Sequence, residues 1–229
     1  MSEADNPTSM VLAIYTASGV EVAALQGDRE TAAASEDAAL ESLLGLVTRS
    51  IKEVKGMLAD LSLIGVCTGP GSFTGLRIGV AFATSLAQAR DVPIVGVSSY
   101  DVAAFGIQTY PLVSVARGKV GYYYARTMEH SDSAPQYVQG GREAIEQAAH
   151  SFSRPAAIVG PDFNVRTPGE AALAVAKLAR RALELGMERT WANIAIDYGQ
   201  RPNAVIRFEQ RRASAQGGPE VLARESTTQ

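Results

Sequence analysis

Two short apolar runs near the start of the chain, separated by small residues, predict a β-hairpin. The runs cover residues 10–15 and 20–25, and Ala17, Ser18 and Gly19 lie between them. Apolar runs of this length that are bounded by turn residues are typical of strands. We therefore expect the chain to open with two antiparallel strands.

A helical period replaces this pattern over residues 38–54. Apolar side chains recur there at intervals of three and four residues, which is the spacing of one face of an α-helix. These apolar positions are Leu40, Leu43, Leu44, Val47, Ile51 and Val54. We expect the stripe to enter the core.

The next stretch combines a strand, a glycine-rich loop and a helix. The apolar run over residues 61–66 predicts a buried strand, and a helix is expected over residues 76–89. In the loop between them, Pro70 and Gly71 suit the two central positions of a type II turn. Such a loop can present N–H groups to a phosphate, although its spacing matches neither common phosphate-binding motif. A phosphate cradle and a tight connection are both compatible with the sequence.

Small residues mark one side of the helix that follows this loop. Ser72 or Thr74 can cap its start. Gly75 and Gly79 lie one turn apart, and an interior glycine costs about 1 kcal/mol against alanine. We infer that another backbone comes close to this side, either from the same lobe or from a partner helix.

The second half of the chain repeats the order hairpin, helix, strand and helix. A strand at 93–97 and a short helix capped by Ser98 complete the first half. Thr167, Pro168 and Glu170 form a capping box ahead of the last long helix. The expected elements of the second half are a hairpin at 112–116 and 120–126, a helix at 142–149, a strand at 156–159, a helix ending at Gly186 and an apolar segment at 191–196.

This repetition predicts two copies of one α/β unit, each a sheet covered by helices. We place the N-terminal lobe at residues 10–108 and the C-terminal lobe at 109–207. Residues 208–229 are polar, and we expect them to form a disordered tail. The alternative is one continuous doubly wound sheet.

Composition narrows the function classes. A net charge of −3 argues against unaided binding of nucleic acid, because such binding depends on neutralising phosphates. Cys67 is the only cysteine, which excludes a disulfide framework and is typical of a reducing compartment. The first ten residues are polar, and no apolar run approaches the roughly 18 residues of a membrane span. We expect a cytoplasmic protein without a membrane partner.

Candidate catalytic and metal-binding residues are few. His130 and His150 are far apart in sequence and do not indicate a metal pair. Ser72 lacks the Gly-x-Ser-x-Gly context of a serine nucleophile. Asp162 follows a predicted strand, where it suits either a ligand contact or a turn. We expect this chain to contain no metal site and no catalytic residue.

The glycine-rich loop carries a resemblance to the TsaB (YeaZ) family. The motif is formed by Gly69, Pro70, Gly71, Ser72, Phe73, Thr74, Gly75 and Arg77, and it continues to Gly79. An alanine-rich helix and residues 92–99 extend the similarity. The resemblance implies an α/β chain with the actin-like (ASKHA) fold of two related RNase H-like lobes. It also implies a non-catalytic subunit in tRNA threonylcarbamoyladenosine biosynthesis.

The resemblance further implies a set of partners. TsaB pairs with TsaD, works with the ATPase TsaE, contacts tRNA only through the complex, and forms a homodimer when alone. The complex uses ATP. The contacts with TsaD are made by two helices of the N-terminal lobe, and by this analogy the partner-binding residues are Leu40, Leu43, Leu44, Val47, Gly75, Leu76, Gly79, Phe82 and Leu86.

Several positions depart from the family pattern. Tyr15 and Val115 stand where TsaB proteins usually carry aspartates, so the hairpins lack carboxylates for a metal-nucleotide. Residues 35–37 lack the usual histidine, and the usual Pro-x-Tyr-Leu-Arg survives only loosely at 202–207. The His-x-x-x-His motif of TsaD is absent. We therefore expect no cofactor on this chain; the alternative is an enzyme in its own right, an actin-like ATP-dependent kinase or ATPase, or a peptidase.

Overall fold

The computed structural model describes residues 9–35, 40–164, 167–188 and 190–199. All of them belong to one compact unit that ends at Gly199. The tail at 208–229, which was expected to be disordered, lies outside the described residues, as does the weak match to Pro-x-Tyr-Leu-Arg at 202–207.

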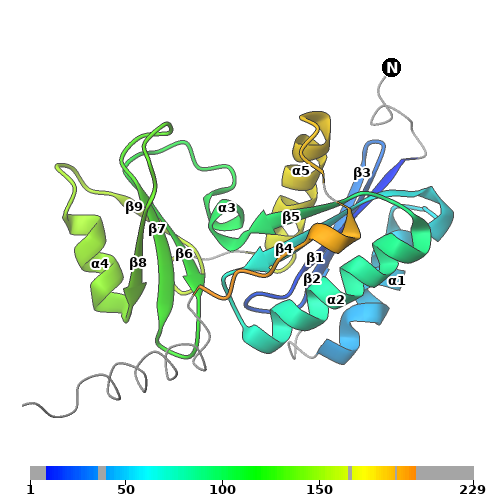
Figure 1. The fold of residues 1–229 in the computed structure, drawn as a ribbon, viewed down its shortest axis with the longest axis horizontal. Helices are drawn as coiled ribbons and strands as arrows, with labels where there is room; N and C mark the ends of the chain where they lie inside the picture. Colours follow the sequence, from blue (N-terminus) through cyan, green and yellow to red (C-terminus); the bar gives the residue numbers. More distant parts are fainter. Residues whose placement is uncertain (1–8, 36–39, 165–166, 189, 200–229) are drawn as a thin grey trace, which may run out of the picture. The chain divides into compact units, whose positions relative to one another are not determined.

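A five-stranded sheet forms the first half of the fold (Figure 1). Its strands are β1 (Met10–Tyr15), β2 (Glu21–Gln26), β3 (Arg29–Ala34), β4 (Leu61–Gly69) and β5 (Ile94–Ser98), in the order β3-β2-β1-β4-β5. The first three strands pair antiparallel, whereas β1, β4 and β5 run parallel. The expected hairpin is confirmed, but it continues into a third strand, β3.

Helices cover both faces of this sheet. On one face, α1 (Leu43–Glu53) and α2 (Phe73–Arg90) share a core with the side chains of β1 that include Leu12 and Ile14. On the other face, α5 (Glu170–Glu184) packs against Val11 and Ala13. The sheet is therefore buried on both sides, as its near-continuous apolar strands indicate.

A second, four-stranded sheet has the order β8-β7-β6-β9. Its strands are β6 (Leu112–Arg117), β7 (Tyr123–Met128), β8 (Gln136–Gly140) and β9 (Ala157–Val159). The helix α4 (Arg142–His150) covers one face through Ile145 and Ala149. The two sheets exclude the alternative of one continuous sheet and agree with the two-lobed fold.

Packing does not follow the expected lobe boundary at residue 108. The helix α3 (Ser99–Ala104) contributes Val102 to the core of the first sheet and Tyr100 and Ala103 to clusters of the second. The helix α5 follows the second sheet in sequence, yet its buried residues pack on the first. Order along the chain predicted the repeat, but it did not show which sheet each helix covers.

Several local expectations were wrong. The positive φ angle of the glycine loop is at Gly69 (+105°), not at Gly71, and the Gly69–Pro70 peptide is cis, so the loop is not a type II turn. The expected capping box at Thr167 is absent, because α5 begins at Glu170 after Gly169 and has no side-chain cap of its own. The helix expected over 38–54 begins with the 3₁₀ turn Leu40–Ser42 and becomes α-helical at Leu43. The strand β8 lies between the expected hairpin and the expected helix at 142–149, where no strand was predicted.

Candidate functional site

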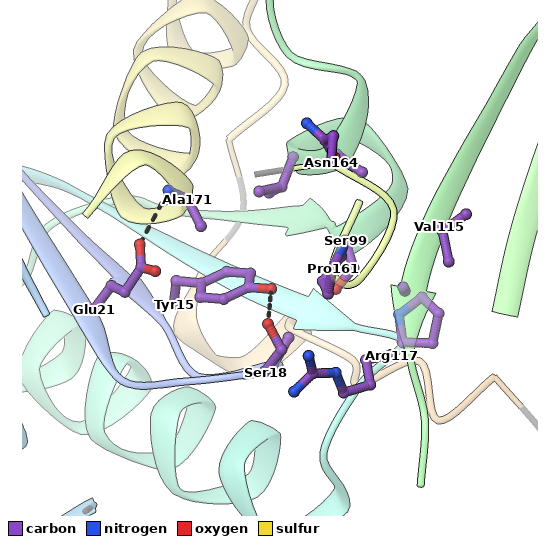
Figure 2. Close-up of a pocket in the computed structure, with 14 residues that line it drawn as sticks. Tyr15, Ser18, Glu21, Ser99, Val115, Arg117, Pro161, Asn164 and Ala171 are labelled. Carbon is purple, nitrogen blue, oxygen red and sulfur yellow. Dashed lines mark hydrogen bonds between the residues drawn. The ribbon is translucent and has the colours of Figure 1, made fainter. Parts of the chain in front are cut away.

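A pocket of about 160 Å³ is lined by residues of both sheets (Figure 2). Tyr15 and Glu21 come from the first hairpin, Ser99 from α3, and Arg117 from the end of β6. Tyr15 and Val115, which stand where TsaB proteins usually carry aspartates, both line this pocket.

The two positions that depart from the family pattern offer no ligand to a cation. The Tyr15 hydroxyl shares a hydrogen bond of 2.7 Å with the Ser18 hydroxyl. The Val115 side chain is fully buried in the core beneath α4. Within the described part of the chain, no group of three or more His, Cys, Asp or Glu residues is placed to hold a metal ion. A phenol and a valine are poor ligands for a hard cation.

Glu21 lines the pocket, and its carboxylate caps the N-terminus of α5. Its Oε2 atom accepts hydrogen bonds from the backbone N–H groups of Ala171 (3.0 Å) and Ala172 (3.1 Å). These are unpaired donors of the first turn of α5, and the carboxylate also meets the positive end of the helix dipole. Glu21 thereby supplies the cap that the local sequence of α5 lacks. Local pattern could not find it, because the partners are about 150 residues apart.

Asp162 anchors the loop opposite the first hairpin. It has a φ angle of +71° and accepts hydrogen bonds from Arg117 Nε (2.9 Å) and the Tyr123 hydroxyl (3.1 Å). A second guanidinium contact makes the Arg117–Asp162 pair bidentate. Asp162 was expected to serve either as a ligand contact or as a turn residue. The structure favours the turn residue, because the carboxylate is paired with Arg117.

The glycine loop packs onto the first hairpin. Ser72 N donates to the Ala17 carbonyl (2.8 Å), and the Ser72 hydroxyl accepts from Gly75 N (3.2 Å). Of the two residues expected as candidates for the cap of α2, Ser72 and Thr74, the structure selects Ser72. Because these N–H groups are used inside the protein, the structure favours the tight connection over a phosphate cradle.

The small residues of α2 face the protein's own hairpin. A Cβ atom added at Gly75 would overlap the Thr16 carbonyl, and one added at Gly79 would overlap the Thr16 side chain. Leu76, between them, is fully buried. The interpretation of these three residues as partner-binding is therefore corrected: the backbone that comes close belongs to the same lobe.

The other proposed partner-binding residues divide by exposure. Leu43 and Val47 are buried on the sheet side of α1, which corrects their assignment to a partner surface. Leu44 is 64% exposed, although the periodicity placed it in the buried stripe. Phe82 and Leu86 are half-buried against the same core. The side-chain environment of Leu40 lies outside the described residues.

The helix α2 has a further exposed apolar residue, Ile78, which was not among the proposed partner-binding residues. Ile78 is 40% exposed and precedes Phe82 and Leu86 at intervals of four residues, so the three form one stripe along α2. At the start of the helix, Phe73 is 57% exposed and its ring lies 5.0 Å from that of Tyr198. The Arg77 guanidinium lies over the Phe73 ring.

The remaining candidates are dispersed. His130 follows β7, whereas His150 ends α4 and contacts the Glu146 carbonyl (2.6 Å). Cys67 is buried beside Ser99, and burial raises the pKa of its thiol to about 11. In the described ranges, no helix has the length and apolar character needed to cross a membrane.

Comparison with protein families decides the affiliation. The family model TsaD, tRNA N6-adenosine threonylcarbamoyltransferase, matches residues 32–198. The protein TsaB of Bacillus subtilis is 44% identical over 66 residues, which cover 27% of this chain and 29% of that protein. The chain belongs to this family, in its TsaB/YeaZ branch.

Other relatives in the family match over limited lengths. An uncharacterized protein of Mycobacterium tuberculosis is 38% identical over 109 residues, which are 44% of this chain and 50% of that protein. A tRNA N6-adenosine threonylcarbamoyltransferase of Thermodesulfovibrio yellowstonii is 28% identical over 129 residues, 53% of this chain and 37% of the enzyme. The chain thus spans about half or less of the curated relatives that it matches.

Solved structures agree on the fold. YeaZ from Pseudomonas aeruginosa has a TM-score of 0.62 with 19% sequence identity, and the match covers 83% of this chain and 99% of YeaZ. A second structure, described as similar to peptidase YeaZ from that organism, has a TM-score of 0.65, also at 19% identity, over 84% of this chain and all of the other. The chain has the actin-like fold of this family.

Proposed function

We propose that this chain is a non-catalytic subunit of tRNA threonylcarbamoyladenosine biosynthesis. The observation that carries the proposal is the 44% identity to TsaB of Bacillus subtilis, a protein named for that process. The chemistry of the pocket between the sheets supports it: Tyr15 and Val115 offer no metal ligand, and Glu21 is engaged by α5. A chain of this kind acts through a partner that carries the reaction.

The proposed partner is a TsaD homologue, and the proposed contact surface is the outward side of α1 and α2. Leu44 and the stripe of Ile78, Phe82 and Leu86 supply exposed or half-exposed apolar side chains there. Burying such side chains against a partner is favourable by about 25 cal/mol per Å² of apolar area. In the absence of TsaD, the same surface pairs two copies of this chain.

The rest of the complex follows the family pattern. A TsaE ATPase consumes the ATP, this chain binds no cofactor for the transfer, and the tRNA substrate is held by the assembled complex. The overall charge of −3 supports this division, because the chain has no excess of basic residues with which to neutralise many phosphates.

One observation favours a second candidate, a transferase in its own right. The matching family model describes a transferase, and a transferase is among the relatives at 28% identity. This candidate needs a metal or nucleotide site on the chain itself.

Co-purification from the native host tests the partnership. A tagged copy of this chain is expected to retain a TsaD homologue at a near-equal molar ratio after size-exclusion chromatography. A tagged Leu44→Asp chain, with the same melting temperature, is expected to retain much less. Recovery of the wild-type chain free of any TsaD homologue would contradict the partnership.

A further inference from the structure

Among the residues that the structure describes, one face of the second sheet is only partly covered. In the strand β7, Tyr124 and Arg126 point to the face opposite α4, and their cross-strand neighbours in β8 are Gln139 and Tyr137. Side chains that alternate along a strand share a face, and directly paired residues lie side by side. The helix α3 covers only part of this face, where Tyr100 packs with Tyr124.

A pocket of about 540 Å³ lies over the uncovered part, and we call it the tyrosine pocket. Its side chains come from separate segments of the chain, and those that matter here are Tyr100, Tyr124, Arg126, Tyr137, Gln139 and Asp197. The volume falls within the roughly 300–1,000 Å³ of small-molecule sites. The pocket is distinct from the one between the sheets and from the helix surface proposed for TsaD.

Aromatic rings dominate its walls. The rings of Tyr100 and Tyr137 lie 5.7 Å apart at an angle of 55°, and the Tyr137 side chain is 64% exposed. Tyr100 and Tyr124 are buried, so Tyr137 supplies the exposed ring. An exposed tyrosine ring on a sheet face is suited to stacking against a flat heterocycle, and a stacked base contributes enough to be measured by alanine substitution. The shape and the rings favour a planar ligand.

The polar groups favour a neutral ligand over an anion. Arg126 is the cation of the pocket wall, and its guanidinium is paired with Asp101 at 2.7 Å and lies over the Tyr100 ring. Asp197 adds a further negative charge. A phenol is already uncharged at neutral pH. Burial raises the pKa of Tyr100 and of Tyr124 further from neutrality. A phosphate would therefore meet no unpaired cation among the described pocket residues.

The acceptors of the pocket suit an amino group. Asp197 Oδ1 accepts a hydrogen bond from the Gly199 N–H group (2.7 Å), and the carboxylate has a second acceptor oxygen. The Gln139 amide can donate and accept at once. A glutamine amide matches the paired donor and acceptor on the edge of adenine. We propose that the tyrosine pocket binds a nucleobase with an exocyclic amine, carried either by a free nucleoside or by an unpaired RNA nucleotide. This inference does not rest on the proposed partnership with TsaD.

Titration of the purified chain with adenosine, uridine and a short single-stranded oligoadenylate tests whether the tyrosine pocket binds a nucleobase. Adenosine is expected to bind saturably and more tightly than uridine, which has no exocyclic amine. Affinity for adenosine is expected to change by less than about twofold between about 50 and 200 mM salt, unlike binding that depends on phosphate contacts. Tighter binding of the oligoadenylate than of adenosine identifies RNA as the source of the base, whereas equal or weaker binding identifies the free nucleoside.

Variants on one strand locate the site. Tyr137→Ala is expected to weaken adenosine binding by about fivefold or more, and Gln139→Ala to reduce the preference for adenosine over uridine. Gln136→Ala, an exposed glutamine of β8 that does not line the pocket, is the matched control and should bind as the wild type does. Equal melting temperatures show that all three remain folded. Absence of saturable binding by both adenosine and oligoadenylate, or equal affinities in Tyr137→Ala and wild type, would overturn the proposal.

Discussion

Thr16 lies against α2 at the two places where that helix has no side chain. The Thr16 side chain is buried, and it approaches the Cα of Gly79 so closely that an added Cβ would overlap it. Gly75 and Gly79 thus make room for α2 to pack onto the first hairpin. This contact also explains why the helix tolerates two glycines that disfavour it.

Gly79→Leu is therefore expected to destabilise the fold by about 1–3 kcal/mol or more, because overpacking displaces the helix from the sheet. Thermal unfolding measures the effect. The matched control is Gly45→Ala on the exposed side of α1, where an added Cβ meets nothing within 4 Å. That change should stabilise the chain by about 0.5–1 kcal/mol through helix propensity. An unchanged melting temperature in Gly79→Leu would show that the glycine does not pack in its own lobe.

Glu21 is expected to stabilise α5 from a distance along the chain. Glu21→Ala leaves two N–H groups of the first turn without their acceptor, and the loss should be about 0.5–2 kcal/mol. Glu21→Gln keeps an acceptor oxygen but removes the charge, so its loss should be smaller. Urea unfolding of the three proteins checks the order. Equal stability of wild type and Glu21→Ala would contradict the assignment.

At the scale of elements, α1 and α2 each present one face to the sheet and one away from it. Leu44→Asp and Ile78→Asp are both expected to weaken binding to a TsaD homologue by about 1–2 kcal/mol, without a lower melting temperature. Leu43→Ala is the contrasting control on the buried face and should lower stability by about 2–5 kcal/mol. Isothermal titration with the partner measures the affinities. Wild-type affinity in both aspartate variants would place the interface elsewhere.

The elements that sequence pattern predicted are those with a strong period. The strand β4 and the helix α2 were recognised because apolar runs and helical spacing agree there. The strand β3, with the sequence Arg-Glu-Thr-Ala-Ala-Ala, has one β-branched residue, Thr31, and no aromatic residue, so its sequence gives only a weak strand signal. Pairing with β2 stabilises it. The edge strand β8 is likewise mostly exposed and polar.

Some residues of the candidate sites could be predicted from the sequence, and others could not. The departures at Tyr15 and Val115 were visible in the sequence, and the structure places both positions in the lining of the pocket between the sheets. The cap made by Glu21 and the grouping of Tyr100, Tyr124 and Tyr137 depend on contacts between distant segments. No local pattern encodes such contacts, so only the folded chain brings them together.

For the whole molecule, the absence of hairpin carboxylates at Tyr15 and Val115 leads to a prediction about nucleotide binding. Magnesium is expected to change the affinity of the isolated chain for ATP by less than about twofold, because hard oxygen ligands are missing from the two hairpin positions. ATP held only by its base would likewise not respond to the metal. Titration with ATP, with and without magnesium, measures this. A tenfold gain in affinity with magnesium would instead support an ATP-dependent enzyme.

The most direct test of the central proposal is the formation of threonylcarbamoyladenosine on tRNA by purified components. The assay contains a TsaD homologue and a TsaE homologue from the same organism, the threonylcarbamoyl adenylate precursor and ATP, with and without this chain. We expect product only when this chain and the TsaD homologue are both present. Product formed by this chain without the TsaD homologue, or full activity of the other components without this chain, would contradict it.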